Sequence, residues 1–365
     1  MNTAKKWSIG FLALTLAMMA AFGGLTAVVD PYFHYHKPLN GLEYPIYEER
    51  YQNDGIVKNF DYDALITGTS MTKNFRTSLM DELFGVSAVK VPLSGSTYKE
   101  VDANLRRGIA ANPELRMVVR SLDGYLLYEE KDTMRTDEVF PDYLYDSSLF
   151  NDTQYVLNKS IFLKGTMRVL EYTRQGNITT SFDNYADTIT EADIGPASVL
   201  RKLDWNPLDW SAVQENQSIS PEMKTIVLEN MLQNVIALVE ENPDIQFYFY
   251  YPPYSIAWWA KNYRSGTLLA QVDCYRIATE MLLEHENVRL FAFENDYDLI
   301  TDLNNYVDYI HYVPAICDRI LMDMHQGDFE LTRENAQSHW DAVQSYYMAF
   351  DYEGYFHNLI ANMAS

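Results

Sequence analysis

Cysteine and basic residues are scarce in this chain. Its 365 residues include two cysteines, Cys274 and Cys317, and 28 lysines and arginines against 51 aspartates and glutamates. Without a CxxC pair a cysteine-based zinc site is not expected, although the two thiols could form one disulfide in an oxidising compartment. The net charge of -23 disfavours nucleic acid as a partner, because neutralising phosphates requires lysine and arginine.

Long apolar runs are also rare, and only the first one could cross a membrane. The run from Trp7 to Val29 carries no charge, and at about 1.5 Å per residue a helix of that length spans the roughly 30 Å hydrocarbon layer. Lys5 and Lys6 precede it, so the positive-inside rule predicts a single-pass anchor (residues 1–30) with residues 31–365 outside the cytoplasm. Small residues between Ala20 and Ala27 leave a cleaved signal peptide, and hence a secreted protein, as the alternative.

Beyond this anchor, short apolar runs alternate with helical stretches. Such alternation predicts a central parallel sheet of about five strands, covered by helices on both faces in a three-layer α/β/α domain. Residues from about 125 to 216 break the pattern and are interpreted as an irregular insertion. The expected strands are Ala64–Gly68, Ser87–Val91, Arg116–Ser121, Ile245–Tyr251 and Val288–Phe293.

Helix signals occur between these strands. Thr97 and Glu100 have the spacing of a capping box, as do Ser78 and Asp81 ahead of a helix ending near Phe84. Apolar residues at helical spacing predict further helices, which are Ser220–Glu241, Leu268–Glu284 and two after Pro314 and Thr332.

Chemically useful side chains follow three of the strands, and in parallel sheets such groups gather at the carboxyl ends. Ser70 comes directly after the first strand, Gly95 after the second, and Asp308-x-x-His311 after the fifth. On one helical turn, residues three apart share a face, so Asp308 could orient the imidazole that takes a proton from Ser70. The N–H groups of Ser70 and Gly95 could stabilise a developing oxyanion.

This order of a serine after the first strand, a glycine after the second and DxxH near the end resembles the SGNH (GDSL-like) hydrolase superfamily. RYQNDGIVKNFDYDALITGTSMTKNF and NNYVDYIHY carry most of the resemblance. It implies a flavodoxin-like fold and is closest to membrane-anchored extracytoplasmic members of Gram-positive bacteria. These members include proteins that transfer D-alanine to lipoteichoic acid or O-acetylate polysaccharides, some beside a membrane-bound O-acyltransferase. The resemblance gives Ser70 as nucleophile, His311 as base, Asp308 as its orienting acid and Gly95 as an oxyanion-hole donor.

Two positions depart from the pattern of this superfamily. Thr69 stands where the GDS block has aspartate, and Asp123 follows the third strand where an asparagine amide often completes the oxyanion hole. An ionised Asp123 would repel an oxyanion, so it must be protonated, turned away or replaced by another donor, for which Asn74 is the candidate.

The expected function is a serine esterase or O-acyltransferase that acts on ester-linked acyl groups of cell-surface polysaccharide or teichoic acid, with no metal or cofactor. Tyr254 and Trp258, after the fourth strand, could wall a pocket together with Asp123. The alternative is a non-catalytic glycan-binding or scaffold protein, in which Ser70 is a helix cap and Asp308 and His311 form a surface pair.

Overall fold

The computed structural model describes residues 3–135, 140–146, 148, 150–183 and 189–363. The chain divides into two compact units. One consists of Met1–Asp61 and Asp137–Asn184, and the other of Tyr62–Thr136 and Tyr185–Ser365. The candidate site lies wholly within the second unit, here called the sheet unit. The first unit holds the long N-terminal helix and is called the anchor unit.

The sheet unit is built on six strands in the order β2-β1-β3-β4-β5-β6. Five strands are parallel, and β6 pairs antiparallel with β5. The strands are β1 (Ala64–Gly68), β2 (Ala88–Pro92), β3 (Met117–Ser121), β4 (Gln246–Tyr251), β5 (Val288–Ala292) and β6 (Glu330–Leu331). The five strands expected from sequence are therefore present within one residue at each end, whereas β6 is too short to give a sequence signal.

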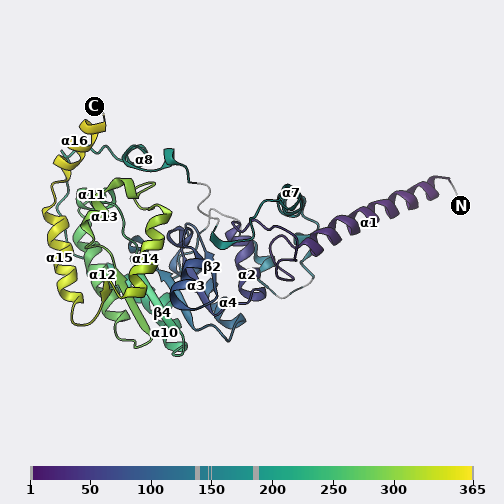
Figure 1. The fold of residues 1–365 in the computed structure, drawn as a ribbon, viewed down its shortest axis with the longest axis horizontal. Helices are drawn as coiled ribbons and strands as arrows, with labels where there is room; N and C mark the ends of the chain where they lie inside the picture. The colour runs from purple at the N-terminus through teal and green to yellow at the C-terminus, as the bar shows by residue number, and fades with distance from the viewer. Residues whose placement is uncertain (1–2, 136–139, 147, 149, 184–188, 364–365) are drawn as a thin grey trace. The chain divides into compact units, whose positions relative to one another are not determined.

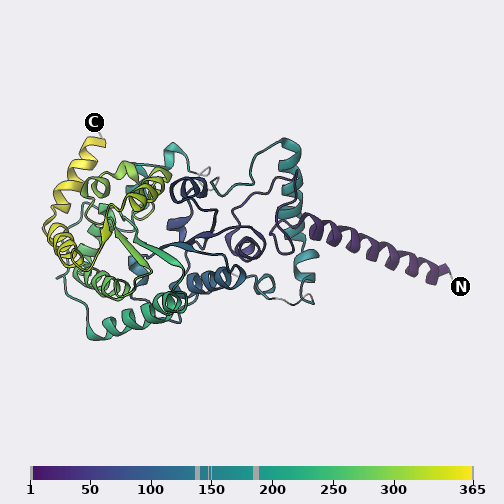
Figure 2. The ribbon, with the colours of Figure 1, turned by 60° about the horizontal axis from the view of Figure 1, so that its bottom comes forward.

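Helices cover both faces of this sheet (Figure 1, Figure 2). From β1 to β2 the chain moves toward one edge of the sheet, and from β2 through β3 and β4 to β5 it moves toward the opposite edge. Because crossovers between parallel strands are right-handed, α3 lies on one face of the sheet. The helices on the other face are α4, α9, α10 and α12. Helix α14 packs against α3, and α15 packs against α12. The main helices are α3 (Thr77–Phe84), α4 (Tyr98–Ala111), α9 (Pro221–Met231), α10 (Ala237–Glu241), α11 (Ile256–Arg264), α12 (Leu268–Leu282), α14 (Pro314–Gln326), α15 (Ala336–Ala349) and α16 (Tyr352–Met363).

The short helical segments of this unit lie mainly in its connections. They are η1 (Ser70–Thr72), η2 (Gly124–Leu126), η6 (Glu191–Asp193), α8 (Pro196–Arg201), η7 (Leu232–Ile236), α13 (Tyr297–Thr301) and η8 (Leu303–Asn305). The expected helix from Ser220 is present, but the π-helical segment η7 divides it into α9 and α10. Such a segment widens the turn by one residue, which shifts the buried face along the helix.

The two expected capping boxes have different outcomes. Thr97 and Glu100 form theirs at the start of α4, with both reciprocal hydrogen bonds present. The box proposed for Ser78 and Asp81 is wrong, because α3 already begins at Thr77. Asp81 instead accepts a hydrogen bond of 2.7 Å from the backbone N–H of Ala88, which attaches α3 to the start of β2.

The two cysteines are buried free thiols. Cys274 lies on α12 and Cys317 on α14, helices that cover opposite faces of the sheet. With the sheet between them, the disulfide left open by the sequence does not form. Burial raises the pKa of the Cys274 thiol to about 12, which keeps it protonated and unreactive.

The anchor unit begins with α1 (Thr3–Val29), a helix that is long and apolar enough to cross a membrane. Directly after it, the Asp30 carboxylate accepts hydrogen bonds from three backbone N–H groups and from the Tyr155 hydroxyl. A small aromatic core surrounds Tyr155. The other elements of this unit are α2 (Glu49–Asn59), η3 (Asp142–Leu144), α5 (Thr153–Val156), α6 (Lys159–Ile161), the π-helical segment η4 (Phe162–Thr166) and α7 (Met167–Gln175).

Candidate active site

Ser70 lies at the carboxyl end of β1, in a turn that requires glycine before it. Gly68 has a φ of 147°, and a Cβ there would collide with the side chain of Ser121 on β3. Thr69 then caps η1, its hydroxyl oxygen accepting a hydrogen bond from the N–H of Met71. Ser70 is the first residue of η1 and is half-buried.

Asp308 and His311 lie in a loop between η8 and α14, not on the helical turn expected from their spacing. An antiparallel bridge between Tyr306 and Tyr312 closes the loop, and the N–H of Val307 donates to the carbonyl of His311 at 2.8 Å. The Asp308 side chain accepts the N–H of His311 at 2.8 Å, so the carboxylate holds the backbone of the loop as well as the imidazole. The spacing of Asp308 and His311 therefore brings the two side chains together through a tight turn. In this turn the aspartate side chain accepts hydrogen bonds from backbone N–H groups that follow it in the chain.

The structure brings Ser70, His311 and Asp308 into one hydrogen-bonded chain. Ser70 Oγ lies 2.8 Å from His311 Nε2, and His311 Nδ1 lies 2.8 Å from Asp308 Oδ2. Burial would raise the pKa of Asp308, but hydrogen bonds and the charge of His311 outweigh it and hold the pKa below its ordinary value. An ionised Asp308 keeps the proton on Nδ1 and leaves Nε2 free to accept the Ser70 proton.

Buried hydroxyl groups fix the loop to the end of the sheet. Tyr306 donates to the carbonyl of Pro253 at 2.8 Å, and Ser255 donates to the carbonyl of Tyr309 at 2.8 Å, both just beyond β4. Tyr312 donates to the carbonyl of Met71 at 3.2 Å, directly beside the serine turn. The distance between Ser70 and His311 is therefore set by several buried contacts on either side of it.

Asp123 is turned away into a buried network of hydroxyl groups. It is fully buried, and its carboxylate accepts from Tyr254 at 2.8 Å, Thr69 at 3.0 Å and Ser121 at 3.1 Å. Burial raises its pKa, although the three hydroxyls and the charge of His311 act in the opposite direction. Asp123 therefore holds Thr69, the residue that precedes Ser70, in place.

The expected oxyanion-hole residues occupy the neighbouring turns. Gly95 lies in an exposed turn after β2 with a φ of 65°, and neither its N–H nor that of Ser70 donates a hydrogen bond within the described part of the chain. The Arg135 guanidinium occupies the space that a Gly95 side chain would fill, and it donates to the carbonyl of Ser94 at 3.1 Å. Asn74 is half-buried in the turn after η1, without a side-chain hydrogen bond among the described residues.

A cavity of about 550 Å³ adjoins the histidine loop. Of the three residues expected to wall a pocket, Trp258 lines this cavity, whereas Tyr254 and Asp123 are buried and bond each other. Its walls combine aromatic rings with amide, hydroxyl and ammonium groups, and they comprise Tyr125, Tyr128, Trp258, Lys261, Asn262, Ser265, Thr267, Tyr309 and Ile310. Such a lining can stack on a sugar ring and bind its hydroxyls.

Sequence reasoning missed Arg135 and the bracing tyrosines. Arg135 lies in the poorly patterned region after β3, where no local signal connects it to Gly95. Tyr250 and Tyr312 share the carbonyl of Met71, but their sequence context gives only an apolar strand and a flank of the DxxH block. The usable signal was the tyrosine hydroxyl itself, since a buried tyrosine at Tyr250 or beside the DxxH block needs a hydrogen-bond partner.

Among the residues that the structure describes, no group of three or more histidine, cysteine, aspartate or glutamate side chains could hold a metal ion. The chain matches no model of a known protein family and no curated protein. The geometry of Ser70, His311 and Asp308 is therefore what bears on function.

Proposed function

We propose that this protein is a serine-dependent esterase or O-acyltransferase of SGNH type. The observation that carries the proposal is the chain from Ser70 Oγ to His311 Nε2 and from His311 Nδ1 to Asp308, with both links at 2.8 Å. The strand order 2-1-3-4-5 is that of flavodoxin-like sheets, and Ser70 and Gly95 lie next to its switch point.

The chemistry follows the proton positions. Ser70 Oγ attacks the ester carbonyl while His311 Nε2 accepts its proton, and Asp308 stabilises the imidazolium. The N–H groups of Ser70 and Gly95 stabilise the tetrahedral oxyanion. His311 then returns the proton to the departing alcohol, leaving an acyl group on Ser70. Water completes hydrolysis, whereas the hydroxyl of a second sugar or polyol completes transfer.

The substrate class is an acylated cell-surface polymer, either a polysaccharide or a teichoic acid. The aromatic and polar cavity beside the histidine loop suits a sugar or polyol. With α1 as a single-pass anchor and lysines on its amino side, the sheet unit lies outside the cytoplasm, where such polymers are found. A membrane-bound O-acyltransferase is a natural donor of the acyl group.

Labelling with a fluorophosphonate probe tests the nucleophile. The full-length protein in detergent should react at Ser70, and Ser70→Ala should abolish the reaction. Ser345→Ala is the matched control, because Ser345 is an exposed serine on α15 that bonds only its own helix. An absence of labelling in folded protein would refute the enzyme and favour a non-catalytic glycan-binding or scaffold role.

A second measurement separates hydrolysis from transfer. Unlabelled protein from a preparation that reacts with the probe should release acetate from acetylated sugars if it is an esterase. An acyltransferase should instead move the acyl group to an added glycan, with acyl-Ser70 trapped in the absence of acceptor. If unlabelled protein whose Ser70 is reactive toward the probe carries out neither reaction, the proposed substrate class is wrong.

A further inference from the structure

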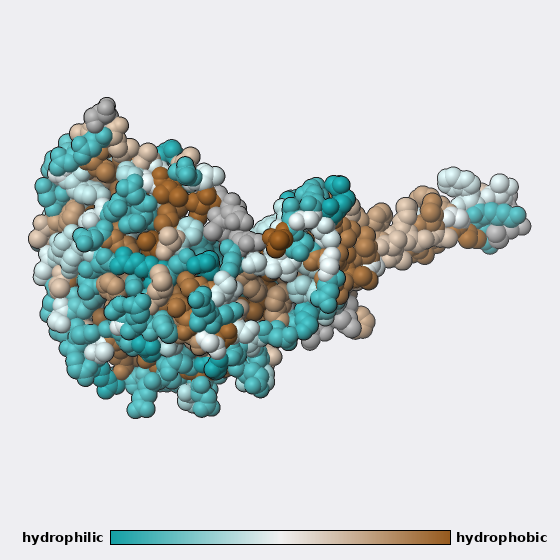
Figure 3. Space-filling view, viewed as in Figure 1, coloured by the Kyte–Doolittle hydropathy of each residue, from teal (hydrophilic) through white to brown (hydrophobic). Residues whose placement is uncertain are grey.

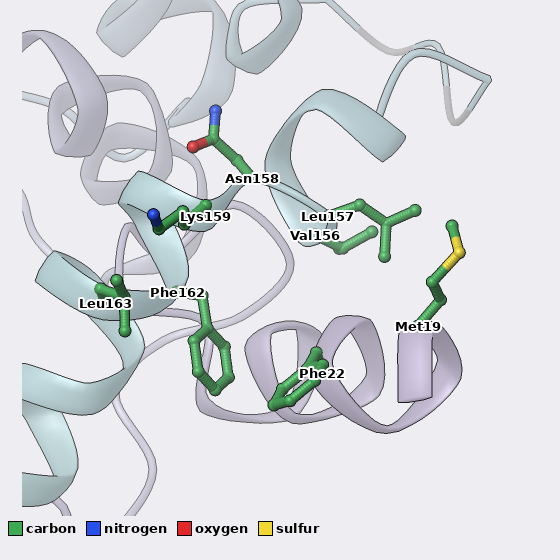
Figure 4. A pocket seen from close by; sticks show the side chains of 8 residues that line it. All are labelled: Met19, Phe22, Val156, Leu157, Asn158, Lys159, Phe162 and Leu163. Carbon is green, nitrogen blue, oxygen red and sulfur yellow. The ribbon is translucent and has the colours of Figure 1, made fainter. Parts of the chain in front are cut away.

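The anchor unit carries an exposed apolar surface beside α1. A cavity of about 400 Å³ lies between α1 and the segment from α5 to η4, as Figure 4 shows. Phe22 of α1 meets Phe162 of η4 edge to face, with ring centroids 4.9 Å apart. Leu157 and Leu163 remain 42% and 53% exposed, and with Met19 and Phe22 they line one contiguous apolar surface.

Position along α1 sets the depth of this surface. About 20 helical residues cross a hydrocarbon layer of about 30 Å. Counted from Trp7, just after the lysines, that length ends near Thr26. Gly23 lies one turn earlier, and its Cα hydrogens face the side chain of Leu157. If α1 spans a membrane, Leu157 and Phe162 are at the depth of the lipid tails.

The apolar contact between α1 and η4 gives way to a polar one toward the carboxyl end of α1. The hydroxyl of Thr166 donates to that of Thr26 at 3.2 Å, in a buried position one turn beyond Phe22. The small side chains of Gly23 and Thr26, both buried, allow the segment to approach α1 closely. In Figure 3, the apolar surface of α1 reaches the part of this unit from which the helix emerges.

The charge of the segment differs from that of the whole protein. Between Thr153 and Gln175 there are four basic residues and one acidic residue, in a chain with a net charge of -23. Lys159 and Lys164 are both exposed and flank the apolar residues of η4. Basic residues beside exposed apolar ones are typical of segments that lie in the surface of an anionic membrane.

We infer that the segment from Val156 to Met167 inserts into the outer leaflet, with its apolar side chains among acyl chains and its lysines on anionic phospholipid headgroups. The inference rests on the membrane anchoring proposed above and adds a second, monotopic contact. Two attachments fix the orientation of the anchor unit on the bilayer, which one helix alone does not.

Site-directed fluorescence on the full chain in phospholipid vesicles tests this. Cys274 and Cys317 are buried, so an environment-sensitive dye reports only an introduced cysteine. Leu163→Cys probes the inferred insertion, and Leu14→Cys on α1 probes the anchor. Glu240→Cys, exposed on α10, is the control in water.

Insertion predicts blue-shifted emission at position 163, quenched by brominated lipids as the emission at position 14 is. Quenching at 163 should decline in Lys159→Glu/Lys164→Glu and in vesicles without phosphatidylglycerol, with no change at 14. Water-like emission at 163 beside quenching at 14 would overturn the inference and leave the anchor. Blue-shifted emission at 163 without lipid quenching would overturn it in favour of a covering protein. Failure at both positions would refute the anchoring.

Discussion

Replacing Asp308 with asparagine should disable the candidate site without unfolding the protein, because the loop backbone dictates how the new amide sits. Asp308 Oδ1 accepts the N–H groups of Ile310 and His311 at 2.9 and 2.8 Å, while Oδ2 faces His311 Nδ1. The asparagine oxygen must take the place of Oδ1, since an NH₂ group there would oppose two N–H donors. The amide nitrogen then faces Nδ1 and forces it to be an acceptor.

The forced tautomer places the remaining proton on Nε2, which can no longer accept a proton from Ser70. Reversing the amide would leave two N–H groups unpaired, at about 1–3 kcal/mol each. Loss of the carboxylate removes a charge-assisted bond to the imidazolium, about 1.5–3 kcal/mol. With each contribution near the lower end of its range, these predict a barrier about 3.5–5 kcal/mol higher, or a rate about a few hundredfold to several thousandfold lower.

The assay is the second-order rate of fluorophosphonate labelling at Ser70. Asp298→Asn, an exposed aspartate on α13, is the matched control and should label at the native rate. Circular dichroism and thermal unfolding should show Asp308→Asn folded. A labelling rate for Asp308→Asn within a fewfold of native would refute the tautomer argument, and with it the assignment of His311 as base.

Three further outcomes follow from buried groups. Asp123→Ala should remove the acceptor of three buried hydroxyls, and urea titrations should show a free energy of unfolding about 3–5 kcal/mol lower. Labelling of Ser70 should also slow. Unchanged stability would contradict the bracing role. Burial raises the pKa of Glu294 well above 4.5, so stability should fall by about 1.4 kcal/mol per pH unit as pH rises from the unfolded pKa to the folded one. Glu294→Gln should flatten that slope, and an equal slope in the variant would be inconsistent with it. Tyr312→Phe should lower the free energy of unfolding by only about 1 kcal/mol, because the Tyr250 hydroxyl still donates to the carbonyl of Met71.

The sheet was predictable because buried parallel strands leave continuous apolar runs, such as ALITG and the stretch from Ile245 to Tyr251. Only β6 escaped, since two residues carry no periodicity. The contribution of residues 137–184 to the anchor unit was not predictable, because no local pattern tells which distant segment an irregular stretch packs against.

The positions of Ser70 and His311 followed from the rule that reactive groups gather at strand ends, but their surroundings did not. Spacing suggested a helical turn for Asp308 and His311, whereas backbone hydrogen bonds to the aspartate favour a tight loop. The buried position of Asp123 depends on three hydroxyl donors that lie at the ends of three different strands. No local sequence pattern indicates that such distant residues meet.

If the proposed reaction is right, the separation of Ser70 and His311 by 241 positions in the chain delays reactivity until the chain has folded. While the polypeptide is still emerging, the hydroxyl has no base beside it and stays as inert as any other alcohol. On the proposed mechanism, Ser70 would become reactive only after the loop that carries His311 has been made and has docked, so a truncated product would not attack esters.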